Sequence, residues 1–344
     1  MASRFQILSL SGGGYRGLYT ATVLAELEGT LGKPLARCFD LLAGTSVGGI
    51  LALGLALEIP AARLAALFER NGDQIFRRQF SVRGYFRARY GTASLKALLS
   101  RPDLFGARLL ESALHRVVVP AINYSSGLPV LFKTDHHPSF KIDYRRSLVD
   151  IALATSAAPF YFRRHIFDHN QYIDGGLFAN APGLVGLHEA ETYLKDVCSM
   201  EDVHMLSVGT MSSIFTVNPG GNCRGGLRDW GQGRALRAAQ RLFGVAISVQ
   251  ESFTSNILRH RLTDERYISL DDILSPDRAQ AVALDKTDAA AREVLIGAGK
   301  ERAKQALGNP RITALLRHTA PPPQFFNRHS SSSPVEPETR SRNA

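Results

Sequence analysis

The pentapeptide Gly-Thr-Ser-Val-Gly at residues 44–48 constrains this chain more than any other feature of its sequence. The segment Phe-Asp-Leu-Leu at 39–42 precedes it and the apolar segment 50–53 follows it, which predicts a strand, a sharp turn and a helix. Such a turn lifts a serine hydroxyl clear of the backbone, and the flanking Gly44 and Gly48 leave room for it. Ser46 is therefore the candidate nucleophile.

A glycine-rich loop, residues 12–17, follows the first predicted strand at residues 5–10 and leads into a helical pattern. Its Gly-x-Gly-x-x-Gly spacing also occurs in dinucleotide-binding folds, which need an acidic residue about 20 positions later at the end of a second strand. Glu26 and Glu28 come too early, and Asp40 precedes its strand. We therefore interpret the loop as an oxyanion hole, in which unhindered backbone N–H groups stabilise developing negative charge. The amides assigned to it are those of Gly12, Gly13 and Gly14.

The base that activates Ser46 is a harder assignment. A Ser-His-Asp triad needs a histidine in a late loop. The candidates, none of which lies in a distinctive local pattern, are His165, His169, His188, His204 and His260. Asp174 instead ends a short apolar strand, and Gly175 and Gly176 after it allow another backbone to approach closely. A carboxylate acts as a base directly when desolvation raises its pKa, although Asp-Gly is also common in ordinary turns.

Strands that alternate with helices predict an α/β fold with a mostly parallel, covered central sheet. Beyond the two units above we expect strands at 129–133, 171–174, 204–208 and 267–270. Helices are expected at 148–154, with Ser147 as N-cap, and at 235–258 and 288–307. The predicted organisation is a catalytic core at 5–210, a mainly helical part at 211–318 packed on it, and a disordered tail at 319–344 that is rich in proline and serine.

Composition limits the cellular setting. The chain has 344 residues, of which 44% are hydrophobic, enough for a sizeable core. Its three cysteines, Cys38, Cys198 and Cys223, are widely spaced and odd in number, which favours a reducing compartment over a disulfide framework or a zinc site. Residues 1–6 show no secretory pattern, and the uncharged run 41–57 contains Ser46, so we interpret it as buried rather than membrane-spanning. We expect a cytoplasmic protein.

The formal charge of +10 favours anionic partners: phospholipid headgroups, nucleic acid or a phosphorylated ligand. No acidic residue lies between Asp73 and Asp103, where arginines interleave with aromatic residues. We predict a membrane-contacting lid there; its contact residues are Arg83, Phe86, Arg87 and Arg89. The same composition is compatible with stacking on single-stranded nucleic acid, or with an arginine-rich lobe whose aromatic rings pack inward.

Four motifs in this order and spacing resemble those of the patatin-like phospholipase family: residues 9–17, 44–49, 154–159 (Ala-Thr-Ser-Ala-Ala-Pro) and 174–176. The resemblance covers residues 5 to 210, and more weakly extends to about 310. It implies a three-layer α/β/α fold, a Ser46 and Asp174 dyad, an oxyanion loop from Gly12 to Gly17 supported by Arg16, and no metal or other cofactor. One departure is Ser11, where many members carry aspartate.

A narrower resemblance concerns residues 11–21, Ser-Gly-Gly-Gly-Tyr-Arg-Gly followed by Leu-Tyr-Thr-Ala. This run is similar to the patatin-like effectors of bacterial CBASS anti-phage systems, phospholipases that a cyclic dinucleotide, usually 3',3'-cyclic GMP-AMP, switches on to degrade the host membrane. It implies membrane phospholipids as substrate, action at the periphery of the inner membrane, and a cyclic dinucleotide as activating ligand.

A cyclic dinucleotide needs cations for its phosphates and rings for its bases. The region 224–241 offers both, as does Arg-His-Arg at 259–261. The candidate ligand-binding residues are Arg224, Arg228, Trp230 and Arg234. We expect no stable nucleic-acid partner, and a homo-oligomer is compatible with the sequence. Two other functions stay open: a lipase or acyltransferase without nucleotide control, and a nucleic-acid-binding protein with an inactive hydrolase core.

Overall fold

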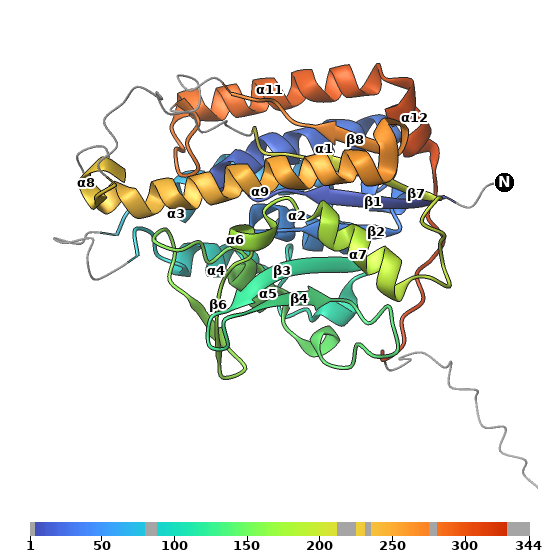
Figure 1. The fold of residues 1–344 in the computed structure, drawn as a ribbon, viewed down its shortest axis with the longest axis horizontal. Helices are drawn as coiled ribbons and strands as arrows, with labels where there is room; N and C mark the ends of the chain where they lie inside the picture. The colour runs from blue at the N-terminus through green and yellow to red at the C-terminus, as the bar shows by residue number, and fades with distance from the viewer. Residues whose placement is uncertain (1–3, 80–87, 212–224, 231–234, 275–280, 329–344) are drawn as a thin grey trace, which may run out of the picture.

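A central eight-stranded sheet organises the computed structural model, which describes residues 4–79, 88–211, 225–230, 235–274 and 281–328 (Figure 1). The strand order is β5-β6-β3-β2-β1-β7-β8, and β4 pairs with β3 off this path. Neighbours from β3 through β8 in this order are parallel, while β4 and β6 run antiparallel to β3, and β5 to β6. The strands are β1 Phe5–Leu10, β2 Leu41–Gly44, β3 Val117–Asn123, β4 Leu128–Lys133, β5 His165–Phe167, β6 Asn170–Asp174, β7 Val203–Val208 and β8 Tyr267–Leu270.

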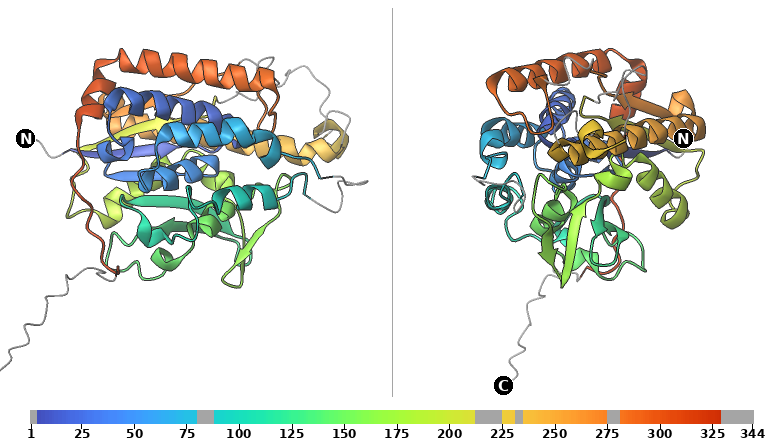
Figure 2. Two further views of the ribbon diagram at one scale, coloured as in Figure 1. Left: turned by 180° about the vertical axis from the view of Figure 1, so that it is seen from behind. Right: turned by 60° about the vertical axis from the view of Figure 1, so that its left-hand side comes forward.

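Helices cover both faces of the sheet, which makes three layers (Figures 1 and 2). The larger core packs one face against α1 Gly17–Leu31, α2 Val47–Ala56, α3 Ala61–Ile75, α4 Ala93–Leu99, α5 Leu148–Thr155, α11 Ala289–Leu307 and α12 Pro310–Arg317. The smaller core packs the other face against α7 Gly183–Tyr193 and α9 Ala235–Arg266, near the short helices α6 Gly176–Ala179 and α8 Leu227–Trp230. Single 3-10 turns are η1 Gly14–Arg16, η2 Leu35–Cys38, η3 Leu110–Ser112 and η4 Asp143–Arg145. The predicted α/β fold with a mostly parallel, covered sheet is confirmed.

Strand β3 brings β2 and β6 together end to end. Val118 of β3 pairs with Ala43 of β2 on one side and with β4 on the other. Three residues further along, Ala121 pairs with Asp174 of β6 on the same side that β2 occupies, because β4 still fills the opposite side. Since β2 is parallel to β3 and β6 is antiparallel, their carboxyl ends point at one another. The residues that follow β2 therefore meet the last residue of β6.

The predicted elements are largely present, with two differences. Ser147 directly precedes α5, but its side chain makes no cap hydrogen bond. Helix α9 continues past the predicted end to Arg266, with a non-helical backbone at Thr263. Asp288 does cap α11, since its side chain accepts a hydrogen bond from the Ala291 N–H. No helix in the described ranges is long and apolar enough to cross a membrane.

The prediction of disorder from residue 319 onward is wrong for residues 319–328, which lie along the core (Figure 1). Asp135 is fully buried, and its carboxylate accepts hydrogen bonds from the Asn327 N–H at 2.8 Å and from Arg328 Nε at 3.0 Å. A buried carboxylate is costly unless it is paired, so this site holds the tail in place. Proline and serine content does not reveal such a distant anchor. Residues 329–344 are outside the described part of the chain.

Candidate active site

The turn between β2 and α2 has the geometry that the pentapeptide predicts. Ser46 has φ 56° and ψ −126°, a backbone conformation that is strained for any residue other than glycine. A Cβ at Gly44 would lie 2.2 Å from the Gly48 carbonyl oxygen, and one at Gly48 would lie 2.2 Å from the Leu10 carbonyl oxygen. Only glycine fits at both positions, so the turn can stay tight enough to present the serine hydroxyl.

Ser46 and Asp174 contact one another directly. The Ser46 hydroxyl donates a hydrogen bond of 2.7 Å to Asp174 Oδ2, and the Gly176 N–H donates one of 2.7 Å to Oδ1. Burial raises the pKa of Asp174 to about 7, against the opposing effect of these two hydrogen bonds. A Cβ at Gly175 would meet the Pro120 carbonyl oxygen at 2.4 Å, so glycine lets the backbone after Asp174 turn against β3. The carboxylate is placed and tuned to accept the serine proton near neutral pH.

Thr155, in the third motif, fixes the backbone of the nucleophile. The Ser46 N–H donates to Thr155 Oγ1 at 2.9 Å, and the Thr155 hydroxyl donates to the Pro120 carbonyl at 2.6 Å. The threonine thus connects the nucleophile turn to β3 through α5. The motif signalled this position, although sequence reasoning had assigned Thr155 no role.

The glycine loop lies beside Ser46, but one of its amides is already used. The Gly12 N–H donates to the Asn180 carbonyl at 2.9 Å, so the prediction that this amide binds the oxyanion is wrong for the arrangement seen here. Gly13 and Gly14 line the pocket with Ser46, and within the described residues neither N–H donates a hydrogen bond. Both amides are therefore free of described acceptors, as donors to an oxyanion would have to be.

Arg16 and Gly17 hold the loop from behind. The buried Arg16 side chain donates from Nη1 to the Met211 carbonyl at 2.8 Å, and burial lowers the pKa of its guanidinium group. A Cβ at Gly17 would lie 2.2 Å from a methyl group of Val47, so this glycine lets α1 approach the start of α2. Arg16, expected to support the loop, thus bonds to the segment after β7, while Gly17, expected within the oxyanion loop, packs against Val47.

Two residues behind the loop have no assignment from the sequence: Asn180 and Glu251. The Asn180 Nδ2 group donates to Glu251 Oε1 at 2.6 Å and to the Gly12 carbonyl at 3.2 Å. Burial raises the pKa of Glu251 to about 7, although the charge of Arg16 opposes this. Glu251 comes from α9, more than 200 residues after Gly12, and no local pattern predicts the contact.

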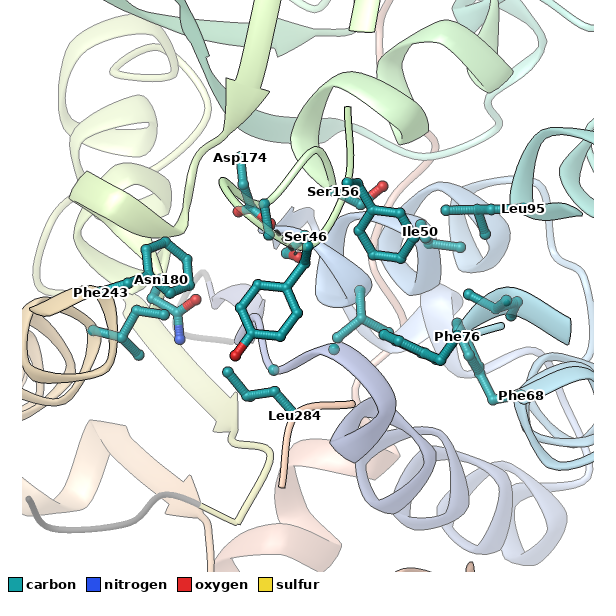
Figure 3. Close-up of a pocket in the computed structure, with 18 residues that line it drawn as sticks. Ser46, Ile50, Phe68, Phe76, Leu95, Ser156, Asp174, Asn180, Phe243 and Leu284 are labelled. Atoms are coloured by element: carbon teal, nitrogen blue, oxygen red, sulfur yellow. Dashed lines mark hydrogen bonds between the residues drawn. The ribbon is translucent and has the colours of Figure 1, made fainter. Parts of the chain in front are cut away.

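The pocket next to the dyad is apolar (Figure 3). Its walls come from both helical layers, and its apolar lining includes Ile50, Phe68, Ile75, Phe76, Leu95, Tyr161, Phe162, Phe243, Ile247 and Leu284. In Figure 3 Ser46 and Asp174 lie together, with Phe76 and Leu95 to one side and Asn180 and Phe243 to the other. Among the residues that the structure describes, no histidine lines this pocket. The apolar lining suits a fatty-acyl chain.

The remaining predicted site residues divide into two groups. Arg83, Phe86, Arg87, Arg224 and Arg234 lie outside the described residues, as does the side chain of Arg228. Arg89 lies within them and forms an ion pair of 2.8 Å with Asp285, so its charge is partly neutralised inside the protein. Trp230 is 45% exposed. The described residues contain no cluster of histidine, cysteine and acidic side chains that fits a metal ion.

Comparison with known proteins places this site in a family. The family model described as patatin-like phospholipase matches residues 8–185, more than half of the chain. This chain belongs to the patatin-like phospholipase family. The match contains the glycine loop, the nucleophile turn and Asp174, so the family prediction is confirmed.

Curated relatives align over nearly the whole chain. A cGAMP-activated phospholipase of Pseudomonas aeruginosa is 45% identical over 94% of this chain and 95% of its own length. One of Vibrio cholerae with the same name is 35% identical over 89% of this chain and 92% of its own length. A cUMP-AMP-activated phospholipase of Escherichia coli is 31% identical over 59% of this chain and 64% of its own length. The similarity therefore extends through the C-terminal helices in the first two cases.

Proposed function

We propose that this protein is a phospholipase that cleaves fatty-acyl esters of membrane glycerophospholipids, and that a cyclic dinucleotide, 3',3'-cyclic GMP-AMP, activates it as a CBASS effector against the cell's own membrane. The observation that carries the hydrolase assignment is the hydrogen bond of 2.7 Å from Ser46 Oγ to Asp174 Oδ2 beside an apolar pocket. The observation that carries the activator is the 45% identity, over 94% of the chain, to a relative named for cGAMP activation.

The proposed reaction has two steps. Asp174 takes the Ser46 proton as the oxygen attacks the ester carbonyl, and the Gly13 and Gly14 amides stabilise the oxyanion. Collapse of this intermediate expels the lysolipid alcohol, which takes the proton back from Asp174, and leaves a fatty-acyl ester on Ser46. Asp174 then accepts a proton from a water molecule that attacks the acyl-enzyme, and gives it to Ser46 Oγ as the Oγ–acyl bond breaks and the fatty acid leaves. Each step uses one carboxylate as base and then as acid.

The hydrolase is tested with phospholipid vesicles and a short-chain ester. Replacing Ser46 by Ala is expected to abolish fatty-acid release from both, because it removes the hydroxyl that donates its proton to Asp174. A fluorophosphonate probe should label the parent protein and not the variant. Fatty-acid release by a folded Ser46→Ala protein at the parent rate would refute the mechanism.

The activator is tested by titration. We expect 3',3'-cyclic GMP-AMP to bind the purified protein and to increase phospholipid hydrolysis, with cyclic UMP-AMP and cyclic di-GMP as comparison ligands because relatives differ in the nucleotide their names state. Arg224, Arg228, Trp230 and Arg234 stay the predicted binding residues. Full activity without any nucleotide would instead indicate an unregulated lipase. If titration with each of the three nucleotides released no heat, the proposed activation by a cyclic dinucleotide would be refuted.

A further inference from the structure

Phe160 combines two properties that a bulky side chain rarely shows together. Its backbone has φ 69°, in the left-handed region, and its side chain is 57% exposed. A phenylalanine at positive φ is a strained residue, and strain of this kind persists only where the surroundings fix the backbone. Burial of the ring does not explain the strain, because the ring faces solvent.

The surroundings do fix this backbone. The Arg89 N–H donates to the Phe160 carbonyl at 3.0 Å, and the Tyr90 N–H donates to the Tyr161 carbonyl at 2.8 Å. Ser156, Ala158, Tyr161 and Phe162 all line the catalytic pocket. We call residues 156–164 the rim loop. It forms part of the pocket wall and holds the Phe160 ring outward from it.

Two cations follow the exposed ring. Arg163 and Arg164 are both exposed, and neither forms an ion pair with any described residue. The Arg164 guanidinium lies 4.9 Å from the centre of the Tyr124 ring, which is 52% exposed. The nearby carboxylates are engaged elsewhere, since Asp285 pairs with Arg89, Asp150 with His165 and Asp168 with Arg146. Three and four residues after the exposed Phe160 ring, the rim loop thus carries two exposed positive charges that no described carboxylate neutralises.

We propose that the rim loop docks on an anionic phospholipid surface, with the Phe160 ring among the acyl chains and the Arg163 and Arg164 guanidinium groups at the headgroup phosphates. An aromatic tip with neighbouring arginines is the combination that binds a lipid interface, and here it adjoins the pocket that would receive one acyl chain. The inference rests on the proposed function only in that the docked lipid is also the substrate. It places the membrane contact on residues other than the predicted lid.

Substitution by glycine at position 160 tests most directly whether the Phe160 ring binds lipid. Phe160→Gly removes the ring and relieves the positive φ, so the protein should keep or raise its melting temperature. Binding is measured by co-sedimentation of the full chain carrying Ser46→Ala, which leaves the lipid intact, with and without 3',3'-cyclic GMP-AMP. We expect Phe160→Gly to lower partition onto phosphatidylglycerol vesicles about tenfold, from the loss of one inserted aromatic side chain.

The charge contribution is tested with a matched pair of double variants. R163E/R164E and the control R145E/R317E each remove four units from the formal charge of +10. Arg145 and Arg317 are also exposed and make no ion pair with described residues, and Arg317 lies on α12, at the end of the molecule where β1 begins (Figure 1). We expect R163E/R164E to lower partition onto phosphatidylglycerol vesicles at least roughly 25-fold, about fivefold for each cation lost, and the control to change it less than about threefold.

Four results would overturn the proposal. The first is an equal loss of vesicle binding in the two double variants, and the second is unchanged partition of Phe160→Gly. The third is no vesicle binding by the parent protein with or without the nucleotide. The fourth is a lower sedimentation coefficient of Phe160→Gly without lipid, which would make the rim loop an interface with a second copy. Hydrolysis of a short-chain ester by the Ser46 form is measured in parallel. If R163E/R164E loses vesicle binding while the parent hydrolyses neither lipid nor ester, docking stands and the proposed function fails.

Discussion

Asp174 and Glu189 are both buried carboxylates, but their surroundings shift their pKa values in opposite directions. Glu189 is fully buried, and burial alone would raise its pKa; hydrogen bonds from His136 at 3.0 Å and Lys133 at 2.8 Å outweigh this and lower it. Asp174 has only a serine hydroxyl and one N–H as partners, so burial prevails and its pKa rises. A carboxylate without a cationic partner is costly to bury, and that cost makes it a base.

The Glu189 cluster also resembles a catalytic triad in its contacts. Thr134 Oγ1 lies 2.8 Å from His136 Nδ1, and His136 Nε2 lies 3.0 Å from Glu189. Thr134 and Glu189 have no exposed surface, and none of the three residues lines the catalytic pocket. A hydroxyl, an imidazole and a carboxylate in sequence are therefore not sufficient for catalysis. Contact with the substrate pocket distinguishes the Ser46 and Asp174 dyad from the structural cluster around Glu189.

The difference in function between Asp174 and Glu189 is tested most strongly by replacing each acid with its amide. Asp174→Asn removes the base and is expected to lower the rate of short-chain ester hydrolysis about 10³- to 10⁴-fold. Glu189→Gln should leave the rate per folded molecule within about twofold, because Glu189 does not contact the pocket. A comparable loss of rate in both variants, measured on folded protein, would show that the two acids are not distinct in function.

Removing the cation from the Glu189 cluster tests the structural role. Lys133→Met leaves the Glu189 charge buried with a single neutral imidazole, and is expected to cost about 3–5 kcal/mol of unfolding free energy at pH 7. Because the folded pKa of Glu189 is depressed, its stabilising effect is present above the unfolded pKa and disappears as pH falls through the folded value. The stability difference between parent and variant, measured by urea unfolding, should therefore shrink in acid. A difference that does not depend on pH would contradict this account.

For Asp174 we expect the opposite effect of its ionisation on the free energy of unfolding. Its folded pKa of about 7 is above the unfolded value, so the native state binds the proton more tightly, and stability falls as pH rises from about 4 to about 7. Asp174→Asn removes this penalty and should raise the unfolding free energy at pH 8 on the order of 2–4 kcal/mol, with little change at pH 4. The comparison needs urea unfolding at both pH values. If Asp174→Asn were destabilised at pH 8, the native surroundings of Asp174 would favour its ionised form.

The same pKa predicts the pH dependence of the reaction. Only ionised Asp174 accepts the serine proton, so kcat/KM for a short-chain ester should rise about tenfold per pH unit below about 7 and level off above it. Glu189→Gln serves as the control and should leave the midpoint in place. A plateau that continues below pH 5 would indicate a base with an ordinary carboxylate pKa.

Glu251 predicts the smallest effect. Glu251→Gln keeps an acceptor for Asn180 and removes the charge near Arg16, so we expect a loss of about threefold to tenfold in kcat with KM nearly unchanged, through the position of the glycine loop. Phe253→Ala, two residues along α9 and 64% exposed, is the matched control. A change confined to KM would place Glu251 in substrate binding instead.

Local patterns predicted the parts of the site that local geometry builds. The nucleophile turn, the strand that ends at Asp174 and the glycine loop each follow from a few adjacent residues whose spacing requires one backbone path. The Gly12 contact with Asn180, the Arg89 pair with Asp285 and the anchoring of residues 319–328 by Asp135 depend on partners more than 150 residues away. Their chemistry is generic, because any arginine can meet any carboxylate, and so the sequence alone left them open.

Because β2 and β6 meet end to end along β3, strand β3 sets the separation between Ser46 and Asp174. Its backbone hydrogen bonds set how far the last residue of β6 stands from the turn after β2, and side chains alternate faces along a strand. A one-residue slip of β6 would turn the carboxylate to the opposite face and separate it from the serine. The hydrogen-bond register of β3 thus sets the distance over which the proton moves from Ser46 to Asp174. An insertion within β3 should abolish activity although every catalytic residue is still present in the chain.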